Sequence, residues 1–254
     1  MAILFCQCIH RGFVDERELA RLMAAVEQSS VRHWIVPDLC LLVEQADDRL
    51  AEIAAAENLV VLACSERAVQ ALFSCAGHAL PSHVKFVNMR DTTVDAALEV
   101  CGLSAASADT PAKGTFTFMP DPGEWVPWYP VLEHDRCVKC AQCAEFCLFD
   151  VDDRGEEGVP LVARPRNCKD NCPACARICP VNAIVFPKAA DPEVSGNMPP
   201  EDGIAKEQTG MSEILKKGVM AGLRQRREQQ REQQSMVRSE VRRALEERAR
   251  HQND

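Results

Sequence analysis

Eight cysteines fall within residues 137–180 and form two runs of nearly equal spacing, CVKCAQCAEFC and CKDNCPACARIC. Each run has three closely spaced thiols and a fourth thiol four residues later. This is the ligand pattern of 4Fe–4S clusters, because three thiolates in one tight loop bind three irons and the fourth iron takes a thiolate from elsewhere. The pattern therefore predicts two such clusters. Their candidate ligands are Cys137, Cys140, Cys143, Cys147, Cys168, Cys172, Cys175 and Cys179.

The fourth cysteine of each run is expected to start a short helix that leaves the loop and to bind the other cluster. One cluster then takes Cys137, Cys140, Cys143 and Cys179, and the other takes Cys147, Cys168, Cys172 and Cys175. This stretch resembles bacterial ferredoxins with two 4Fe–4S clusters. The resemblance implies a small α+β ferredoxin-like domain over residues 130–188, with Tyr129–Glu133 and Ala183–Phe186 as its terminal pair of strands.

Two departures from the common pattern stand in this stretch. The second run opens C-x3-C instead of C-x2-C, and the first run ends in Cys147-Leu148 instead of Cys-Pro. Both departures keep the number of ligands. The alternatives are two zinc sites, which have no need of the trailing Cys-x3-Cys-Pro, and disulfides, which an export signal would favour.

Residues 1–105 alternate apolar runs with helical patterns. The expected strands are Ala2–Phe5, Trp34–Val36, Leu59–Ala63 and Val84–Val87. The expected helices are Glu16–Gln28, Asp47–Glu57, Glu66–Ala76 and Val94–Cys101, with Asp15 and Ser65 as N-caps. This alternation predicts an α/β domain, in which a parallel sheet is covered by helices on both faces.

Further cysteines follow the expected strands. Two follow the first strand, and one each follows the second and the third; they are Cys6, Cys8, Cys40 and Cys64. Because the carboxyl ends of parallel strands meet at the ligand-binding edge of an open sheet, these thiols are candidate ligands of a third iron–sulfur cluster. The alternative is that they are small core residues, as free cysteines often are. Cys75 and Cys101 lie within helical patterns and are expected in the core.

The segments FCQC, DLC and VVLACSERAVQALF are similar to the amino-terminal domain of heterodisulfide reductase A subunits. The matching residues are Cys6, Cys8, Cys40, Ala63, Cys64 and Ser65. This resemblance implies a module of a multi-subunit electron-transfer assembly, with a cluster of its own. The flavin domain of that family carries a Gly-x-Gly-x-x-Gly run, which is absent here, so no flavin or NAD site is expected.

The remaining segments connect or extend these domains. Residues 106–129 are expected to form a proline-rich connector, in which Trp125, Trp128 and Tyr129 shield a cluster or join the two domains. Residues 189–210 are expected to be a flexible linker. Residues 211–254 are expected to form a charged helical arm with apolar ends that docks onto a partner subunit. A coiled coil and a partly ordered tail are the alternatives.

Charge and composition bear on location and partners. The net charge of the chain is −9, and residues 211–254 carry +4 of it, so the rest of the chain carries −13. An acidic body argues against nucleic acid as a partner and suits basic redox partners. The start of the chain shows no export signal, and no apolar run approaches the roughly 20 residues of a membrane span. A cytoplasmic location is therefore expected.

These features favour an iron–sulfur electron-transfer subunit of a larger oxidoreductase. No catalytic residues are predicted, because the six histidines are scattered and form no set with a nucleophile or a carboxylate. One alternative is an enzyme that uses the thiols of the amino-terminal domain for disulfide or sulfur chemistry. The other is a redox-sensing scaffold that reports oxidation to a partner.

Overall fold

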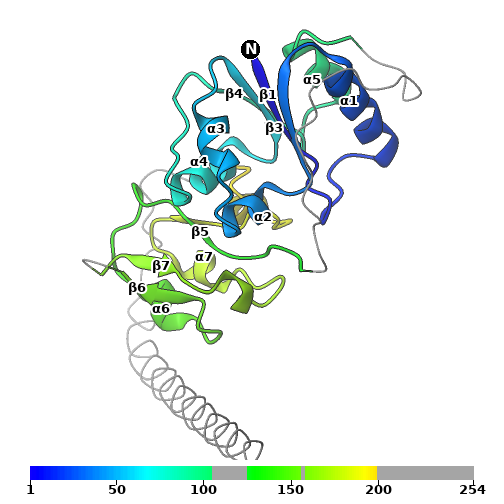
Figure 1. The fold of residues 1–254 in the computed structure, drawn as a ribbon. Helices are drawn as coiled ribbons and strands as arrows, with labels where there is room; N and C mark the ends of the chain where they lie inside the picture. The colour runs from blue at the N-terminus through cyan, green and yellow to red at the C-terminus, as the bar shows by residue number, and fades with distance from the viewer. Residues whose placement is uncertain (105–124, 156–157, 199–254) are drawn as a thin grey trace, which may run out of the picture.

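The computed structural model describes residues 1–104, 125–155 and 158–198, and its first part is built on a four-stranded sheet (Figure 1). The strands are β1 (Ala2–Cys6), β2 (Arg32–Val36), β3 (Leu59–Ala63) and β4 (Lys85–Asn88). All pairings are parallel, and the strand order is β2-β1-β3-β4. The two central strands are buried along their whole length, as expected of a sheet that is covered on both faces. The predicted parallel α/β domain is confirmed.

Helices cover both faces of the sheet. Helices α1 (Glu16–Gln28) and α5 (Val94–Val100) belong to one core, which includes Ile3, Phe5 and Leu62 from the central strands. The other core takes the alternate strand residues, such as Leu4 and Val61. It includes side chains of α2 (Leu39–Glu44), α3 (Arg49–Ala54) and α4 (Glu66–Cys75).

Side-chain caps explain where several of these helices begin. The Asp15 carboxylate accepts a hydrogen bond from the N–H of Arg17 at the start of α1, and the Ser65 hydroxyl accepts one from Ala68 at the start of α4. Such caps satisfy N–H groups that have no partner within the helix. Both predicted N-caps are confirmed.

Two predictions in this domain need correction. Helix α2 was not expected, and it begins directly after β2 because the Asp38 carboxylate accepts from the N–H groups of Cys40 and Leu41. The helix expected over Asp47–Glu57 is shorter, since α3 spans Arg49–Ala54. Ala46 separates α2 from α3 with a positive φ of 49°, which ends a helix.

The segment that carries the eight cysteines, residues 130–188, is called the module below and is built from short elements. Strand β5 (Val131–Leu132) pairs antiparallel with β8 (Ile184–Val185), as predicted. A second hairpin, β6 (Asp152–Arg154) with β7 (Pro160–Val162), lies between the two cysteine runs and was not predicted. Helix α6 (Gln142–Phe146) belongs to the first run, and α7 (Ala174–Ile178) belongs to the second, after a 3-10 turn at Pro165–Asn167.

The chain after β8 returns to the sheet domain instead of leaving the molecule. Helix α8 (Pro192–Ser195) buries Val194 and Ser195, and the Ser65 hydroxyl donates to the carbonyl of Ser195 at 3.1 Å. The first ten residues of the expected flexible linker, 189–198, are therefore ordered. The strand-like run 115–118 and the arm 211–254 lie outside the described residues. No helix among the described residues is long and apolar enough to cross a membrane.

Polar contacts join the module to the sheet domain. Arg67 of α4 pairs with Glu133, with an Nε–Oε2 distance of 2.9 Å, and also donates to the carbonyl of Asn182. Arg166 pairs with Glu44 at the end of α2, with an Nε–Oε1 distance of 2.6 Å. The module therefore packs directly beneath the sheet domain in the view of Figure 1.

Candidate iron–sulfur centres

The structure gathers the eight predicted ligands of the module around two cavities. Each cavity takes three cysteines from one run and the fourth cysteine of the other run. One cavity, of about 410 Å³, is lined by Cys147, Cys168, Cys172 and Cys175. The other, of only about 10 Å³, is lined by Cys137, Cys140, Cys143 and Cys179. These are the two ligand sets that follow if the fourth cysteine of each run binds the other cluster.

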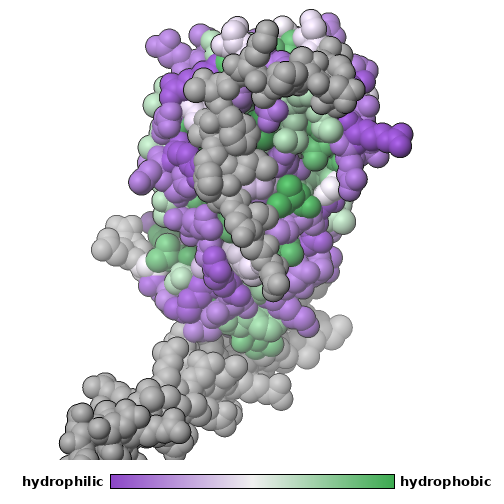
Figure 2. Space-filling view, turned by 45° about the vertical axis from the view of Figure 1, so that its right-hand side comes forward, coloured by the Kyte–Doolittle hydropathy of each residue, from purple (hydrophilic) through white to green (hydrophobic). Residues whose placement is uncertain are grey.

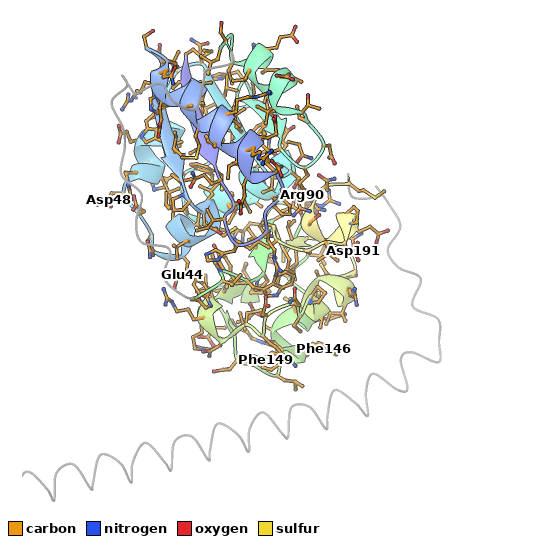
Figure 3. All side chains as sticks on the ribbon, turned by 90° about the vertical axis from the view of Figure 1, so that its right-hand side faces the viewer. Glu44, Asp48, Arg90, Phe146, Phe149 and Asp191 are labelled. Carbon is orange, nitrogen blue, oxygen red and sulfur yellow. The ribbon has the colours of Figure 1, made fainter. Side chains whose placement is uncertain are left out.

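Apolar side chains surround both cavities. Phe146, Leu148 and Phe149 line the first, and Figure 3 places the two labelled phenylalanines together at the end of the module away from the sheet. Val138 and Ile184 line the second. Several of these side chains remain partly open to solvent, such as Leu148 and Val138, and Figure 2 shows hydrophobic surface at the lower end of the molecule. An apolar shell of this kind lowers the local dielectric and tunes the potential of a bound cluster.

The fourth cysteine of each run ends a helix, which corrects the expectation that it starts one. Cys147 is the C-cap of α6 and Cys179 is the C-cap of α7, and both have extended backbone angles. The chain therefore turns away from the helix axis at each of these residues. This turn, and not a departing helix, directs the fourth thiol to the other cavity.

Backbone N–H groups point at sulfur in both runs. The N–H of Lys139 lies 3.4 Å from the Cys137 Sγ, and the N–H of Ala183 lies 3.2 Å from the Cys179 Sγ. Lys139 and Ala141 have positive φ angles of 57° and 56°, which turn the backbone of the loop inward. Donors aimed at sulfur stabilise negative charge on it, as a metal-bound thiolate requires.

The protonation of these thiols follows from their burial. Burial raises the pKa of Cys143 and that of Cys168 to about 12, and it raises the pKa of Cys175 well above its usual value. The carboxylate of Asp152, which lies near all three, raises these pKa values further. These three thiols are therefore protonated at neutral pH, and their binding to a metal would release protons.

The spacing of the ligands differs from that of a site for a single metal ion. Within residues 1–104, 125–155 and 158–198, no group of three or more His, Cys, Asp or Glu side chains is close enough to hold one ion. The cysteines line cavities, and the thiolates of a four-iron cluster bind its separate corners.

The amino-terminal cysteines meet at the carboxyl edge of the sheet, where the strand order predicted them. Cys6 ends β1, Cys40 lies in the first turn of α2, and Cys64 follows β3. Cys8 lies in the loop after β1 with a positive φ of 50°. All four are buried in one hydrophobic core, which also includes Tyr129 of the connector and is contacted by Cys168 of the module. The structure therefore brings these thiols together next to the module.

The four thiols differ in acidity. The pKa of Cys6 is lowered, chiefly by a hydrogen bond with the Cys8 thiol, and the N–H of Leu39 also lies 3.2 Å from the Cys6 Sγ. The same hydrogen bond, together with burial, raises the pKa of Cys8. Burial raises the pKa of Cys64 to about 12 and also raises that of Cys40. Cys6 is therefore the most readily ionised of the four.

The other two cysteines differ in burial. Cys101 is fully buried in the core beneath α1 and α5, as predicted. Cys75 is exposed, so its prediction as a core residue is wrong. It lies at the end of α4, where the core-facing stripe has ended, and its Sγ lies 3.2 Å from the carbonyl of Leu132 in the module.

The three aromatic residues of the connector join the two parts of the molecule. The Tyr129 hydroxyl donates to the carbonyl of Cys40 at 2.5 Å, and Tyr129 stacks on Trp125. Trp128 stacks on Phe186 in the core of the module, and its Nε1 lies 3.5 Å from the carbonyl of Cys172. The domain-joining alternative is therefore confirmed, and Trp128 also contacts a loop that bears candidate ligands.

Known proteins share the segment that resembles ferredoxins. An uncharacterized ferredoxin of Methanocaldococcus jannaschii is 41% identical over 63 residues, which span 24% of this chain and 42% of that protein. Ferredoxin-3 of a Nostoc species is 34% identical over 76 residues, which span 23% of this chain and 77% of the relative. The pyruvate synthase subunit PorD of M. jannaschii is 37% identical over 62 residues, which span 24% and 70%.

These matches define a ferredoxin-like 4Fe–4S domain that occupies about a quarter of the chain. Two of the relatives are matched over more than two thirds of their length, so the chain belongs to the ferredoxin family through this segment. The chain spans less than half the length of the first relative. No family model matches the chain, and no solved structure matches it.

Proposed function

We propose that the chain is an electron-transfer subunit that binds two 4Fe–4S clusters in the module of residues 130–188. The observation that carries this proposal is the pair of cavities, each lined by three cysteines of one run and the fourth of the other. Such clusters supply one-electron redox chemistry when bound. The residues of the chain hold the clusters through eight thiolates, shield them with apolar side chains and donate N–H groups to sulfur.

The crosswise ligand sets are tested with single cysteine variants. In low-temperature EPR spectra after dithionite reduction, Cys147→Ala is expected to perturb the same cluster signal as Cys168→Ala. Cys179→Ala is expected to perturb the same signal as Cys137→Ala. Cys75→Ala is the control, because Cys75 is exposed and lies outside both cavities. If Cys147→Ala instead perturbs the signal that depends on Cys137, the ligand sets are wrong.

The amino-terminal thiols extend this proposal to a third cluster. Their convergence at one sheet edge supports it, as does the resemblance to heterodisulfide reductase A subunits. About twelve irons per chain would indicate three clusters and about eight would indicate two. Cys40→Ala is then expected to remove about four irons. Equal iron contents of this variant and the native chain would exclude the third cluster.

A thiol or disulfide enzyme is the second candidate, and the hydrogen-bonded pair Cys6 and Cys8 favours it. In that case the chain carries about eight irons, and a lowered pKa makes Cys6 the nucleophile. The module would supply the electrons that reduce a substrate disulfide. Loss of disulfide reduction in Cys6→Ala, with unchanged iron content, would favour the enzyme over the relay.

We also propose that partner oxidoreductase subunits exchange electrons with this chain, and that residues 211–254 dock onto one of them. The support is that relatives are named as subunits of pyruvate synthase and of an NADH-dependent phenylglyoxylate dehydrogenase, the latter in Aromatoleum evansii.

A truncated chain that ends at residue 204 tests whether residues 211–254 dock onto a partner. The truncated chain should retain its clusters but no longer co-purify with the partner. Retained co-purification contradicts the docking role, whereas loss of assembly without loss of electron transfer favours the scaffold alternative.

A further inference from the structure

Lys188 and Asp38 form an ion pair at the junction of the two parts of the molecule. The Lys188 Nζ lies 2.8 Å from the Asp38 Oδ1, and each side chain is only 1% exposed. Lys188 follows β8 of the module, whereas Asp38 caps α2 of the sheet domain. Burying two charges costs several kcal/mol of desolvation, so such a pair is a poor source of stability. Its position beside the amino-terminal thiols indicates another role.

A second cation holds the segment that carries Lys188. The guanidinium of Arg90 donates to the carbonyl oxygens of Pro187 and Ala189, the residues on either side of Lys188, and the second of these bonds is 3.0 Å long. Figure 3 shows Arg90 at the level where the sheet domain meets the module. Lys188 interacts electrostatically with Cys40 and Cys8, and Arg90 interacts with Cys64.

Both cations also have carboxylates near them. Asp38 pairs with Lys188, Asp91 interacts electrostatically with Arg90, and the Asp38 Oδ2 is buried without a hydrogen-bond partner in the described part of the chain. Burial by itself would lower the pKa of Lys188, and the negative charge of Asp38 is among the causes that raise it. The ion pair therefore places a buried ammonium group at the edge where the four thiols meet.

We infer that Lys188, which the module supplies, is part of the amino-terminal thiol site, and that it stabilises negative charge on the group which the four thiols hold. The inference rests on the proposed function in taking that group to be the third cluster. Reduction adds one negative charge to a cluster with four thiolates. A buried cation beside it favours the reduced form and raises its reduction potential. The site is complete only when both parts of the chain are docked.

Two substitutions of opposite sign test this role. Lys188→Met removes a positive charge and is expected to lower the midpoint potential of the cluster signal that Cys64→Ala abolishes. Asp38→Asn removes a negative charge, keeps a good N-cap for α2, and is expected to raise that potential. The double variant should return close to the native value. EPR-monitored redox titration of the full chain measures all three.

The controls separate charge from structure. Lys188→Arg should keep the native potential, and Lys85→Met removes an exposed charge on β4 and should leave it unchanged. A purely structural ion pair would make both single variants lose iron without opposite shifts of potential, and that result would overturn the inference. If Lys188→Met does not fold, Asp38→Asn and the double variant test the inference instead. An unchanged potential in Asp38→Asn would also overturn the inference.

A different result would identify failure of the proposed third cluster. If no signal of the native chain depends on Cys64, the thiol site holds no cluster. That outcome rejects the third cluster. If a Cys64-dependent signal is present but the opposite shifts of potential are missing, the role of Lys188 alone is rejected.

Discussion

At the scale of single residues, Tyr129 connects the module to the thiol edge of the sheet. Its ring is buried in the core of the sheet domain, and its hydroxyl donates to the carbonyl of Cys40. This bond holds the first turn of α2, where the backbone also bears a candidate ligand. The side chain therefore fixes the position of Cys40 relative to the module.

Tyr129→Phe is expected to lower the free energy of unfolding by about 1 kcal/mol, because the buried hydrogen bond from its hydroxyl to the carbonyl of Cys40 is lost. Thermal and urea unfolding measure the change. Cluster absorbance at low temperature should remain, since no ligand is removed. An unchanged unfolding midpoint would mean that this carbonyl finds another donor.

Lys188 shows why some site residues escape sequence analysis. A lysine between two short segments is ordinarily exposed, and nothing in the sequence links it to Asp38, which is 150 residues away. Only the docking of the module onto the sheet domain brings them together. The four amino-terminal cysteines were predictable, by contrast, because parallel topology places the residues that follow each strand at one edge.

At the scale of secondary-structure elements, helix α8 turns sharply at Gly196 and brings the chain back onto α4. Gly196 has a φ of 76°, and a Cβ atom there would lie 3.1 Å from the Val185 Cγ1 and 3.2 Å from the Ser65 Oγ. The residue therefore needs both the left-handed backbone and the absence of a side chain. The segment that holds Lys188 is fixed at its far end by this turn.

Gly196→Ala is expected to destabilise the protein by more than Gly77→Ala does. Gly77 has a nearly equal φ of 78°, but nothing lies within 4 Å of its added Cβ, so its substitution costs only backbone strain of about 1 kcal/mol. Gly196→Ala adds steric contact to the same strain. Unfolding curves of the two variants measure the difference. Equal losses of stability would show that the side chains of Val185 and Ser65 move aside without cost.

The elements of the sheet domain were largely predictable, because short apolar runs and side-chain caps are local signals. Helix α2 was missed because its start depends on the Asp38 cap in a stretch that reads as a continuation of the strand. The hairpin of β6 and β7 was missed because each strand has only three residues and those of β6 are all charged. The positions of Cys147 and Cys179 at helix ends depend on loop geometry, which cysteine spacing alone does not specify.

At the scale of the whole molecule, polar contacts hold the module against the sheet domain. One group of these contacts is centred on Arg67, which pairs with Glu133 and donates to the carbonyl of Asn182. The two paired side chains are 12% and 16% exposed, so the pair is largely shielded from water. Removal of Arg67 leaves the largely buried Glu133 carboxylate with a more distant cation, the Arg136 Nε, which lies 3.8 Å from its Oε2.

Arg67→Met is expected to reduce the free energy of unfolding by about 3 kcal/mol and to increase protease cleavage between the two parts. Arg32→Met is the matched control, since the Arg32 and Glu52 side chains are 59% and 49% exposed and such pairs contribute little. Thermal unfolding and limited proteolysis measure both effects. Equal behaviour of the two variants would show that other contacts hold the module.

The interleaving of the two cysteine runs around two cavities has a consequence for maturation. Neither run surrounds a cavity alone, because each cavity takes the fourth cysteine of the other run. If each cavity holds a cluster, as we propose, binding of the first would position both runs for the second, and loss of one would loosen the other. Partly filled chains would then be scarce beside empty and fully loaded molecules.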